Sequence, residues 1–349
     1  MSSATGTIFM RRSTTLLAGM ALAAAGLIAV PSSAKAAALT SGTLTVQRSV
    51  GKDASCNITN PSATDNKPFT SNGATVASTV AGTSTITDPG EPADTTTVPS
   101  SIKGSIRAKE SGGQLTSIAL DTVVKAKINA AQGLGSDCDP SATNTVAATF
   151  AMNLTRSKWV TVKAELPSTS VLQMIVQRTA PANPTSIEQI AMIGTNKGRA
   201  TAEFLLPTGT FQVQMVLQHV LLTPTTPAAP TSADAKQSVD ITFVDAGSAI
   251  GKAVGDGSKY LKLDKARKCA TGKLQAKFTA AAGKGKLAKI KKAIFKVNGK
   301  KKATVKFPTK GKKVKLKGLV SGDEANVKVI LRYRKGGKAT VTRSYLSCT

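Results

Sequence analysis

Residues 292–307 of the chain read KAIFKVNGKKKATVKF. On both sides of the Asn298-Gly299 pair, apolar residues alternate with residues that are mostly lysine. Asn-Gly is a preferred two-residue hairpin turn, because both residues tolerate positive φ angles. The stretch therefore predicts two antiparallel strands, 292–297 and 302–307, each with one buried face and one lysine-rich face.

Similar alternation predicts further strands over 273–280, 313–317, 327–334 and 339–346. Six or seven short strands in about 90 residues, with turn residues between them, are typical of an immunoglobulin-like β-sandwich. We therefore expect such a sandwich over 259–349.

Charge is distributed very unevenly along the 349 residues. The chain has a formal net charge of +28. Residues 252–349 hold 29 Lys and Arg against four acids, which is a net charge of +25. Such asymmetry indicates two modules with different roles. Small residues over 247–258 predict a flexible linker between an N-terminal module, 37–246, and the basic module.

The N-terminus has the pattern of a secretory signal peptide. Arg11 and Arg12 precede an apolar run over 16–30, and small residues follow it. We predict a signal peptide over 1–36 with cleavage after Ala36, with Ala38 as the nearest alternative. An uncleaved anchor is a second interpretation, but 15 apolar residues are short for a membrane span, which takes about 20.

Four cysteines, an even number in an exported chain, predict disulfides. Three connectivities are possible in principle. Pairing Cys56 with Cys138 and Cys269 with Cys348 keeps each bridge inside one predicted module, so we favour it.

The N-terminal module is also rich in predicted strands. Apolar residues alternate over 150–154, 160–166, 172–176, 211–217 and 239–243. Stretches rich in Thr, Ser, Pro and Gly are interpreted as loops, notably 81–101 and 223–234. The segment LPTGTFQV, residues 206–213, resembles the late hairpin of bacterial pre-peptidase-like jelly rolls. The fold class predicted for the whole chain is all-β, with a jelly-roll-like N-terminal and an immunoglobulin-like C-terminal sandwich after the cleaved signal peptide.

Three motifs of the basic module carry a second resemblance. Lys-Cys-x-x-Gly-Lys-Leu at 268–274, Val-Asn-Gly at 297–299 and Ser-Tyr-Leu-Ser-Cys at 344–348 resemble the basic immunoglobulin-like tail domain of secreted actinobacterial proteins. The resemblance covers 260–349 and implies this fold and an exported location. It implies no functional residue.

The alternating lysines predict a surface for polyanions. High local positive charge attracts anionic polymers, and Lys outnumbers Arg 25 to 4 over 252–349, which favours contact without sequence specificity. Exposed aromatic residues are nearly absent from the predicted pattern, which argues against single-stranded nucleic acid. The candidate polyanion-binding residues are Lys273, Lys277, Lys292, Lys296, Lys302, Lys306, Lys313, Lys315, Lys317, Lys328, Arg332 and Arg334.

The residues that catalysis or metal binding would need are sparse. His219 is the only histidine and continues the inward register of 211–217, so we interpret it as a core residue. Asp137 and Asp139 beside Cys138 lack the ligand spacing of a calcium loop. A Gly-x-Ser-x-Gly motif is absent, and no two acids are placed for glycoside hydrolysis. We predict no catalytic residue, metal or cofactor.

Together these patterns predict a secreted, non-catalytic binding or surface-associated protein, extracellular or bound to the cell wall. Its basic module is expected to hold it on anionic envelope polymers. One alternative is a purely structural extracellular protein whose lysines maintain solubility. Another is a secreted enzyme with its site in the N-terminal module.

Overall fold

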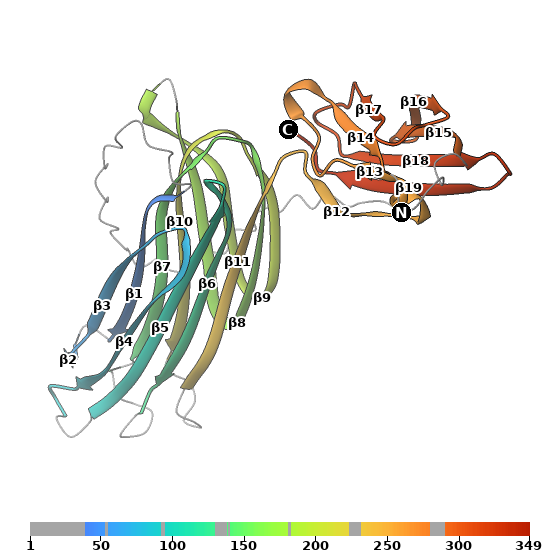
Figure 1. Ribbon diagram of the computed structural model, residues 1–349. Helices are drawn as coiled ribbons and strands as arrows, with labels where there is room; N and C mark the ends of the chain where they lie inside the picture. The colour runs from blue at the N-terminus through green and yellow to red at the C-terminus, as the bar shows by residue number, and fades with distance from the viewer. Residues whose placement is uncertain are drawn as a thin grey trace. The chain divides into compact units, whose positions relative to one another are not determined.

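The computed structural model describes residues 39–52, 55–91, 95–129, 138, 140–180, 183–222, 232–279 and 290–349. The predicted signal peptide and the two aspartates beside Cys138 lie outside these residues. Within them the chain is built almost entirely of antiparallel strands, in two β-sandwiches with separate cores (Figure 1). The all-β prediction is confirmed. In the described part of the chain, no helix has the length and apolar character needed to cross a bilayer.

The N-terminal sandwich is formed by one long sheet of eleven strands that folds over on itself. Its strand order is β2-β4-β5-β6-β11-β8-β10-β7-β1-β3, with β9 paired to β8. The strands are β1 (Leu39–Gly51), β2 (Asn57–Thr59), β3 (Ser62–Phe69), β4 (Asn72–Thr87), β5 (Thr95–Ser111), β6 (Gln114–Lys127), β7 (Ser141–Leu154), β8 (Lys158–Ala180), β9 (Asn183–Leu206), β10 (Gly209–Leu222) and β11 (Ser232–Asp245).

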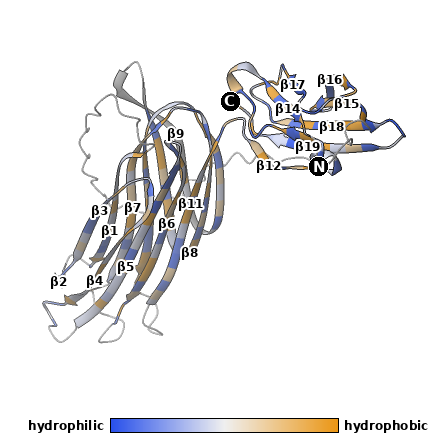
Figure 2. Ribbon diagram, viewed as in Figure 1, coloured by the Kyte–Doolittle hydropathy of each residue, from blue (hydrophilic) through white to orange (hydrophobic). Residues whose placement is uncertain are grey.

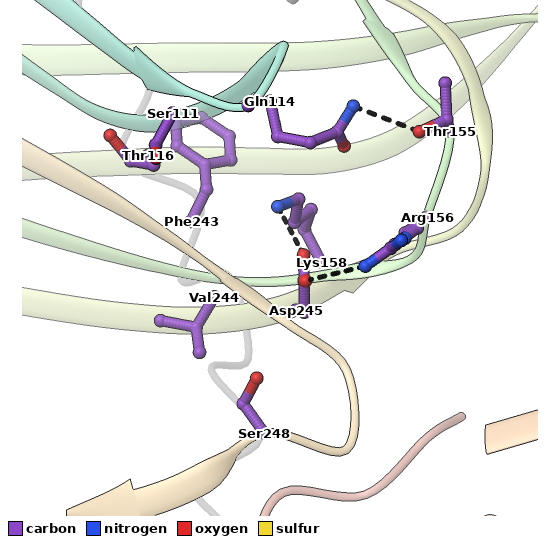
Figure 3. A pocket seen from close by; sticks show the side chains of 11 residues that line it. Ser111, Gln114, Thr116, Thr155, Arg156, Lys158, Phe243, Val244, Asp245 and Ser248 are labelled. Atoms are coloured by element: carbon purple, nitrogen blue, oxygen red, sulfur yellow. Dashed lines mark hydrogen bonds and ion pairs between the residues drawn. The ribbon is translucent and has the colours of Figure 1, made fainter. Parts of the chain in front are cut away.

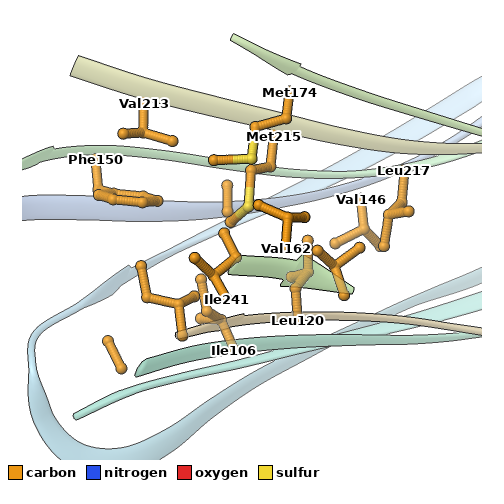
Figure 4. Packing of buried hydrophobic residues seen from close by; sticks show 14 of the residues in the cluster. Ile106, Leu120, Val146, Phe150, Val162, Met174, Val213, Met215, Leu217 and Ile241 are labelled. Carbon is orange, nitrogen blue, oxygen red and sulfur yellow. The ribbon is translucent and has the colours of Figure 1, made fainter. Parts of the chain in front are cut away.

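Strand β8 connects the two layers of this sandwich. Its first half, from Lys158 to Glu165, pairs with β11, and its second half, from Ser170 to Arg178, pairs with β10. Facing strands then meet across the core, with β1 packing against β4 and β5 and β7 against β5 and β6. Figure 4 shows the interdigitated side chains, among them Phe150, Met215 and Ile241, which are at most 2% exposed.

The stretch 81–101, predicted as a loop, is mostly strand. Strand β4 continues to Thr87, and β5 begins at Thr95. Its threonines are β-branched and suit a pleated surface, and Val98 and Ile102 point into the core. The loop prediction was wrong because Ser84, Thr96 and Ser100 occupy inward, buried positions, so the alternation of polar and apolar residues is interrupted there.

The C-terminal sandwich packs a five-stranded sheet, in the order β12-β19-β18-β15-β16, on a three-stranded sheet, β13-β14-β17. Its elements are β12 (Ala249–Val254), a 3-10 turn (Asp256–Lys259), β13 (Leu261–Leu263), a second 3-10 turn (Cys269–Thr271), β14 (Leu274–Phe278), β15 (Ile290–Val297), β16 (Lys300–Lys306), β17 (Lys313–Leu316), β18 (Ala325–Tyr333) and β19 (Lys338–Tyr345). Figure 2 shows hydrophobic and hydrophilic residues alternating along these strands.

The core of this sandwich follows from that alternation. Phe278 and Phe295 are fully buried, and their rings meet edge to face with centroids 6.3 Å apart. The disulfides Cys56–Cys138 and Cys269–Cys348 are both formed, so the predicted pairing is confirmed.

The structure differs from the linker predicted over 247–258. Residues Ala249–Val254 form β12, which pairs with β19 at the edge of the five-stranded sheet. The register of this pair shifts between Ile250 and Val254, and Gly251 there has a φ of 73°. The shift breaks the alternation, which explains why the sequence pattern concealed the strand.

Candidate functional site

Four cationic residues form a straight row across the outer face of the five-stranded sheet. The backbone register places Lys306 of β16 opposite Lys292 of β15, Lys292 opposite Arg332 of β18, and Arg332 opposite Lys338 of β19. Adjacent strands lie about 4.8 Å apart, so the four Cα positions span about 14 Å. We call these four residues the first cation row.

A second cation row runs parallel to the first. It consists of Lys301, Lys296 and Lys328, opposite one another on β16, β15 and β18. Between the rows lies a neutral stripe in which half-buried Ile294 faces Ile330. The rows are four residues apart along each of β15 and β18, or about 13 Å. The sheet thus presents two lines of positive charge on either side of an uncharged strip.

Lys302 does not occupy the position that simple alternation predicts. The pairing of β15 and β16 shifts between Phe295 and Lys296, so Lys301 rather than Lys302 faces Lys296. The ammonium of Lys302 donates to the carbonyl of Gly318 at 3.1 Å. This shift removes Lys302 from the rows and puts Lys301, which the sequence analysis did not select, into the second row.

Carboxylates are absent from these strands. The five strands of the sheet contain no Asp or Glu. Among the residues that the structure describes, all the ion pairs lie in the N-terminal sandwich. Like charges directly opposite each other on a sheet are destabilising. Lys292, between Lys306 and Arg332, and Lys296, between Lys301 and Lys328, each form two such pairs. The folded sheet therefore concentrates positive charge at a cost in stability.

The remaining candidate lysines lie on the other face of the sandwich. Lys262, Lys277 and Lys313 are opposite one another on β13, β14 and β17. Lys315 faces Gln275 in the same sheet, while Lys273 and Lys317 flank its strands. Because both sheets cover one core, their outer faces point away from each other. The predicted lysines are thus divided between two faces.

Two arginines of the basic module bind its own backbone. Arg267, 4% exposed, donates to the carbonyls of Leu346, Val320, Ser321 and Asp323. Burial lowers the pKa of its guanidinium, which nearby Asp323 and Glu324 partly offset. Arg343 donates to the carbonyls of Leu263, Asp264 and Gly251. These two guanidinium groups donate hydrogen bonds to backbone carbonyls of several segments and so hold these segments together. The sequence pattern did not indicate this role.

Phe307 lies beyond the end of the first cation row, next to Lys306. Alternation predicts an inward side chain, but the residue is 54% exposed and has a φ of 47°. A left-handed backbone costs a non-glycine residue about 1–2 kcal/mol. The guanidinium of Arg334 lies over the Phe307 ring, 5.1 Å from its centroid. The inward prediction was wrong because the chain turns as soon as β16 ends at Lys306.

A second row of polar residues is buried inside the N-terminal sandwich. Arg48, Asn144, His219 and Ser170 lie opposite one another on β1, β7, β10 and β8, and each is 3% exposed or less. Burial lowers the pKa of His219. The prediction that His219 is a core residue is confirmed, but its neighbours in the register are polar rather than apolar.

This buried polar row is connected to the opposite layer at both ends. Arg48 Nη1 donates to Ser84 Oγ at 3.1 Å, and Gln237 Nε2 donates to Ser170 Oγ at 2.7 Å. The buried amide of Asn144 has no hydrogen-bond partner among the residues of known position. The row separates the main apolar cluster from a smaller one that surrounds the Cys56–Cys138 disulfide. We refer to it as the polar layer.

An open hollow of about 500 Å³ lies at one end of the N-terminal sandwich (Figure 3). Buried Lys158 forms an ion pair with Asp245, whose other oxygen lies 3.6 Å from Arg156 Nη1. Gln114 Nε2 donates to Thr155 Oγ1 at 3.0 Å. Asp245, the carboxylate found among the described residues that line this hollow, is thus held by two cations, an arrangement that suits a structural ion pair better than acid–base chemistry.

Among the acids of the N-terminal sandwich whose positions are described, Asp121 has a raised pKa. Partial loss of solvent around its carboxyl group and the nearby charge of Asp240 raise this pKa, and Arg107 opposes the shift. Asp121 itself is exposed on β6. Among the residues whose positions are described, no three His, Cys, Asp or Glu side chains are grouped as metal ligands would be. Trp159 is half-buried and lies outside the apolar clusters.

No protein-family model matches the chain, and no curated protein matches it. Among solved structures, the chain has partial similarity to TmCBM61 in complex with β-1,4-galactotriose, at 9% identity, over 34% of this chain and 74% of that one, with a TM-score of 0.20. The adhesin domain of Epf from Streptococcus pyogenes is 11% identical over 69% and 79% of the two chains, with a TM-score of 0.18. A CBM22 tandem domain of Paenibacillus barcinonensis Xyn10C is 11% identical over 69% and 85%, also at 0.18. Such values establish neither a ligand nor an activity for this chain.

Proposed function

We propose that the protein is an exported, non-catalytic binding or surface-associated protein. Its C-terminal sandwich holds it on anionic polymers of the cell envelope through the two cation rows of the five-stranded sheet. The observation that carries the proposal is the alignment of seven cations in two rows on strands that contain no acid.

Electrostatics favour this function over a role in solubility alone. A soluble surface is served by interspersed charges of both signs, whereas the cation rows place like charges opposite each other at a cost in stability. A bound polyanion would remove that repulsion and release its own counterions, which favours association. Lysine ammonium groups are hydrated point charges, so the contact is expected to be non-specific and sensitive to salt.

Export is supported by two independent features. The N-terminal residues have the charge, apolar run and small residues of a signal peptide. Both disulfides are formed, and structural disulfides persist mainly in oxidising compartments such as the cell exterior. An extracellular position would bring the basic sandwich next to the anionic polymers that we propose as its partners.

Retention of the full mature chain on immobilised teichoic acid across a salt series tests the proposal. One variant carries Lys292→Gln, Lys296→Gln and Lys328→Gln. Each lysine that contacts a phosphate contributes about 0.7–0.9 to the slope of log affinity against log salt, so this variant should lower the slope by about 2. A neutral glycan should retain neither protein.

The opposite face supplies a matched control. Replacing Lys262, Lys277 and Lys313 by glutamine removes the same charge from the three-stranded sheet. We expect this variant to lower the slope less, because the three-stranded sheet carries one row of opposed lysines, whereas the five-stranded sheet carries two rows that a polymer can contact together. Equal effects of the two triple variants would show that only net charge matters and would refute a defined binding face. Unchanged retention in both would favour the purely structural alternative, in which the lysines serve solubility.

A further inference from the structure

We propose that Phe307 and Arg334 form a stacking site for one base of a single-stranded nucleic acid whose phosphates lie along the first cation row. The inference rests on the proposed polyanion-binding function and adds to it a class of partner. The sequence alone argued against this partner, because alternation placed Phe307 in the core; the structure leaves its ring half exposed.

The geometry connects the ring directly to the row. Phe307 follows Lys306, the first member of the row, and its backbone N–H donates to the carbonyl of Lys291 at 3.0 Å. Arg334 follows Arg332, the third member, by two residues, and its guanidinium lies 5.1 Å from the centre of the Phe307 ring. The aromatic ring, the stacked guanidinium and the row of cations thus adjoin at one corner of the sheet.

The turn itself does not require an aromatic residue. A φ of 47° suits asparagine or glycine, and a bulky side chain there is an outlier. Contact with an exposed guanidinium offsets part of that strain and leaves the ring exposed to solvent. Strained backbone conformations cluster at functional sites, and a ligand that stacks on the ring would explain why an aromatic residue stands in this turn.

At the corner formed by Phe307 and Arg334, the ring and the guanidinium plane suit a nucleic acid better than a polyanion without aromatic groups. Single strands combine closely spaced phosphates with accessible base faces, which stack on aromatic rings and on guanidinium planes. A duplex hides these faces, and polyphosphate has none. Recognition of sugar hydroxyls would use carboxylate acceptors, which the five strands lack. Because every base has a flat face, the site would tolerate any sequence.

The test measures binding of the full mature chain to three probes: a short oligothymidylate, a duplex of equal length and polyphosphate. Phe307→Asn keeps a residue that tolerates the left-handed backbone but removes the ring. We expect oligothymidylate binding to weaken about tenfold, the value of one lost base stack. Duplex and polyphosphate binding should stay within about twofold, and the salt slope should not change, since no phosphate contact is lost.

Two further variants separate the possible failures. Val320→Asn removes another exposed apolar side chain of the same sandwich, 64% exposed, and should affect no probe. The triple glutamine variant of Lys292, Lys296 and Lys328 should weaken binding to all three probes. If it does and Phe307→Asn leaves oligothymidylate binding intact, or weakens all probes equally, the stacking site is refuted and the polyanion function stands. If the triple variant changes nothing, the polyanion function fails, and this inference fails with it.

Discussion

Replacing Lys292 by glutamate should make the C-terminal sandwich more stable. Lys292 is half-buried and lies between Lys306 and Arg332, so the wild-type sheet holds two like-charge pairs at this position. The substitution converts both into opposite-charge pairs. Cross-strand charge pairs contribute about 0.2–1 kcal/mol each, so the expected gain is about 1–2 kcal/mol at low salt. For a domain of this size, 1 kcal/mol raises Tm by about 4–8 °C.

Calorimetry of the full mature chain measures this effect. The gain should be largest at about 10 mM salt and should shrink greatly at about 1 M, where the screening length falls from roughly 30 Å to roughly 3 Å. Lys335→Glu makes the same change of charge in the turn between β18 and β19, outside the row, and should stay within about 0.5 kcal/mol. A loss of stability in Lys292→Glu at low salt, or a gain that salt does not reduce, would refute the idea that the row is repulsive.

Three further predictions concern other parts of the molecule. Burial lowers the pKa of His219 in the folded chain. Below about pH 6.5, the ordinary pKa of histidine, the unfolded chain therefore binds a proton at this residue that the folded chain does not bind. The urea concentration at the unfolding midpoint of the N-terminal sandwich should therefore decrease as the pH is lowered from about 7.5 to about 5.5. His219→Gln should abolish most of that decrease, and a variant with the same pH profile as the wild type would contradict this explanation. A lysine in place of Arg267 lacks the planar set of N–H donors that binds the backbone carbonyls. Arg267→Lys should therefore destabilise the C-terminal sandwich by about 2–4 kcal/mol in urea unfolding. A loss below about 1 kcal/mol would show that water replaces the carbonyl contacts. Replacing both Cys56 and Cys138 by alanine should cost up to about 4–5 kcal/mol, since their bridge closes a loop of 82 residues, and an unchanged urea midpoint would show that the bridge adds no stability.

The sequence predicted those features that depend on neighbouring residues. The pleat of a strand reverses side-chain direction at every residue, so strands 292–297 and 302–307 were found to within a few residues. The inward side of strand 211–217 was also predicted correctly. Pairing of cysteines within each module followed from their positions alone.

Features that depend on how strands pair were missed. The register shift that moves Lys302 out of the rows exists only between β15 and β16. Strand β12 has no clear alternation of its own and pairs with the edge of β19. The exposure of Phe307 follows from a turn that the alternation could not show. Neither cation row could be assembled from sequence, because each joins residues from strands whose register was unknown.

The polar layer has a consequence for how the N-terminal sandwich reaches a single arrangement. Its strands are long, and most of their inward positions hold small or medium apolar residues such as Val46 and Val50, which are nearly interchangeable. A slip of two residues would keep every apolar side chain inward. It would, however, move Arg48 or His219 out of the polar layer and into an apolar cluster. There the side chain would lie away from the polar residues that it now faces. The polar layer thus specifies the register of these strands. A shifted sheet would bury the same polar groups without their hydrogen-bond partners and would be less stable.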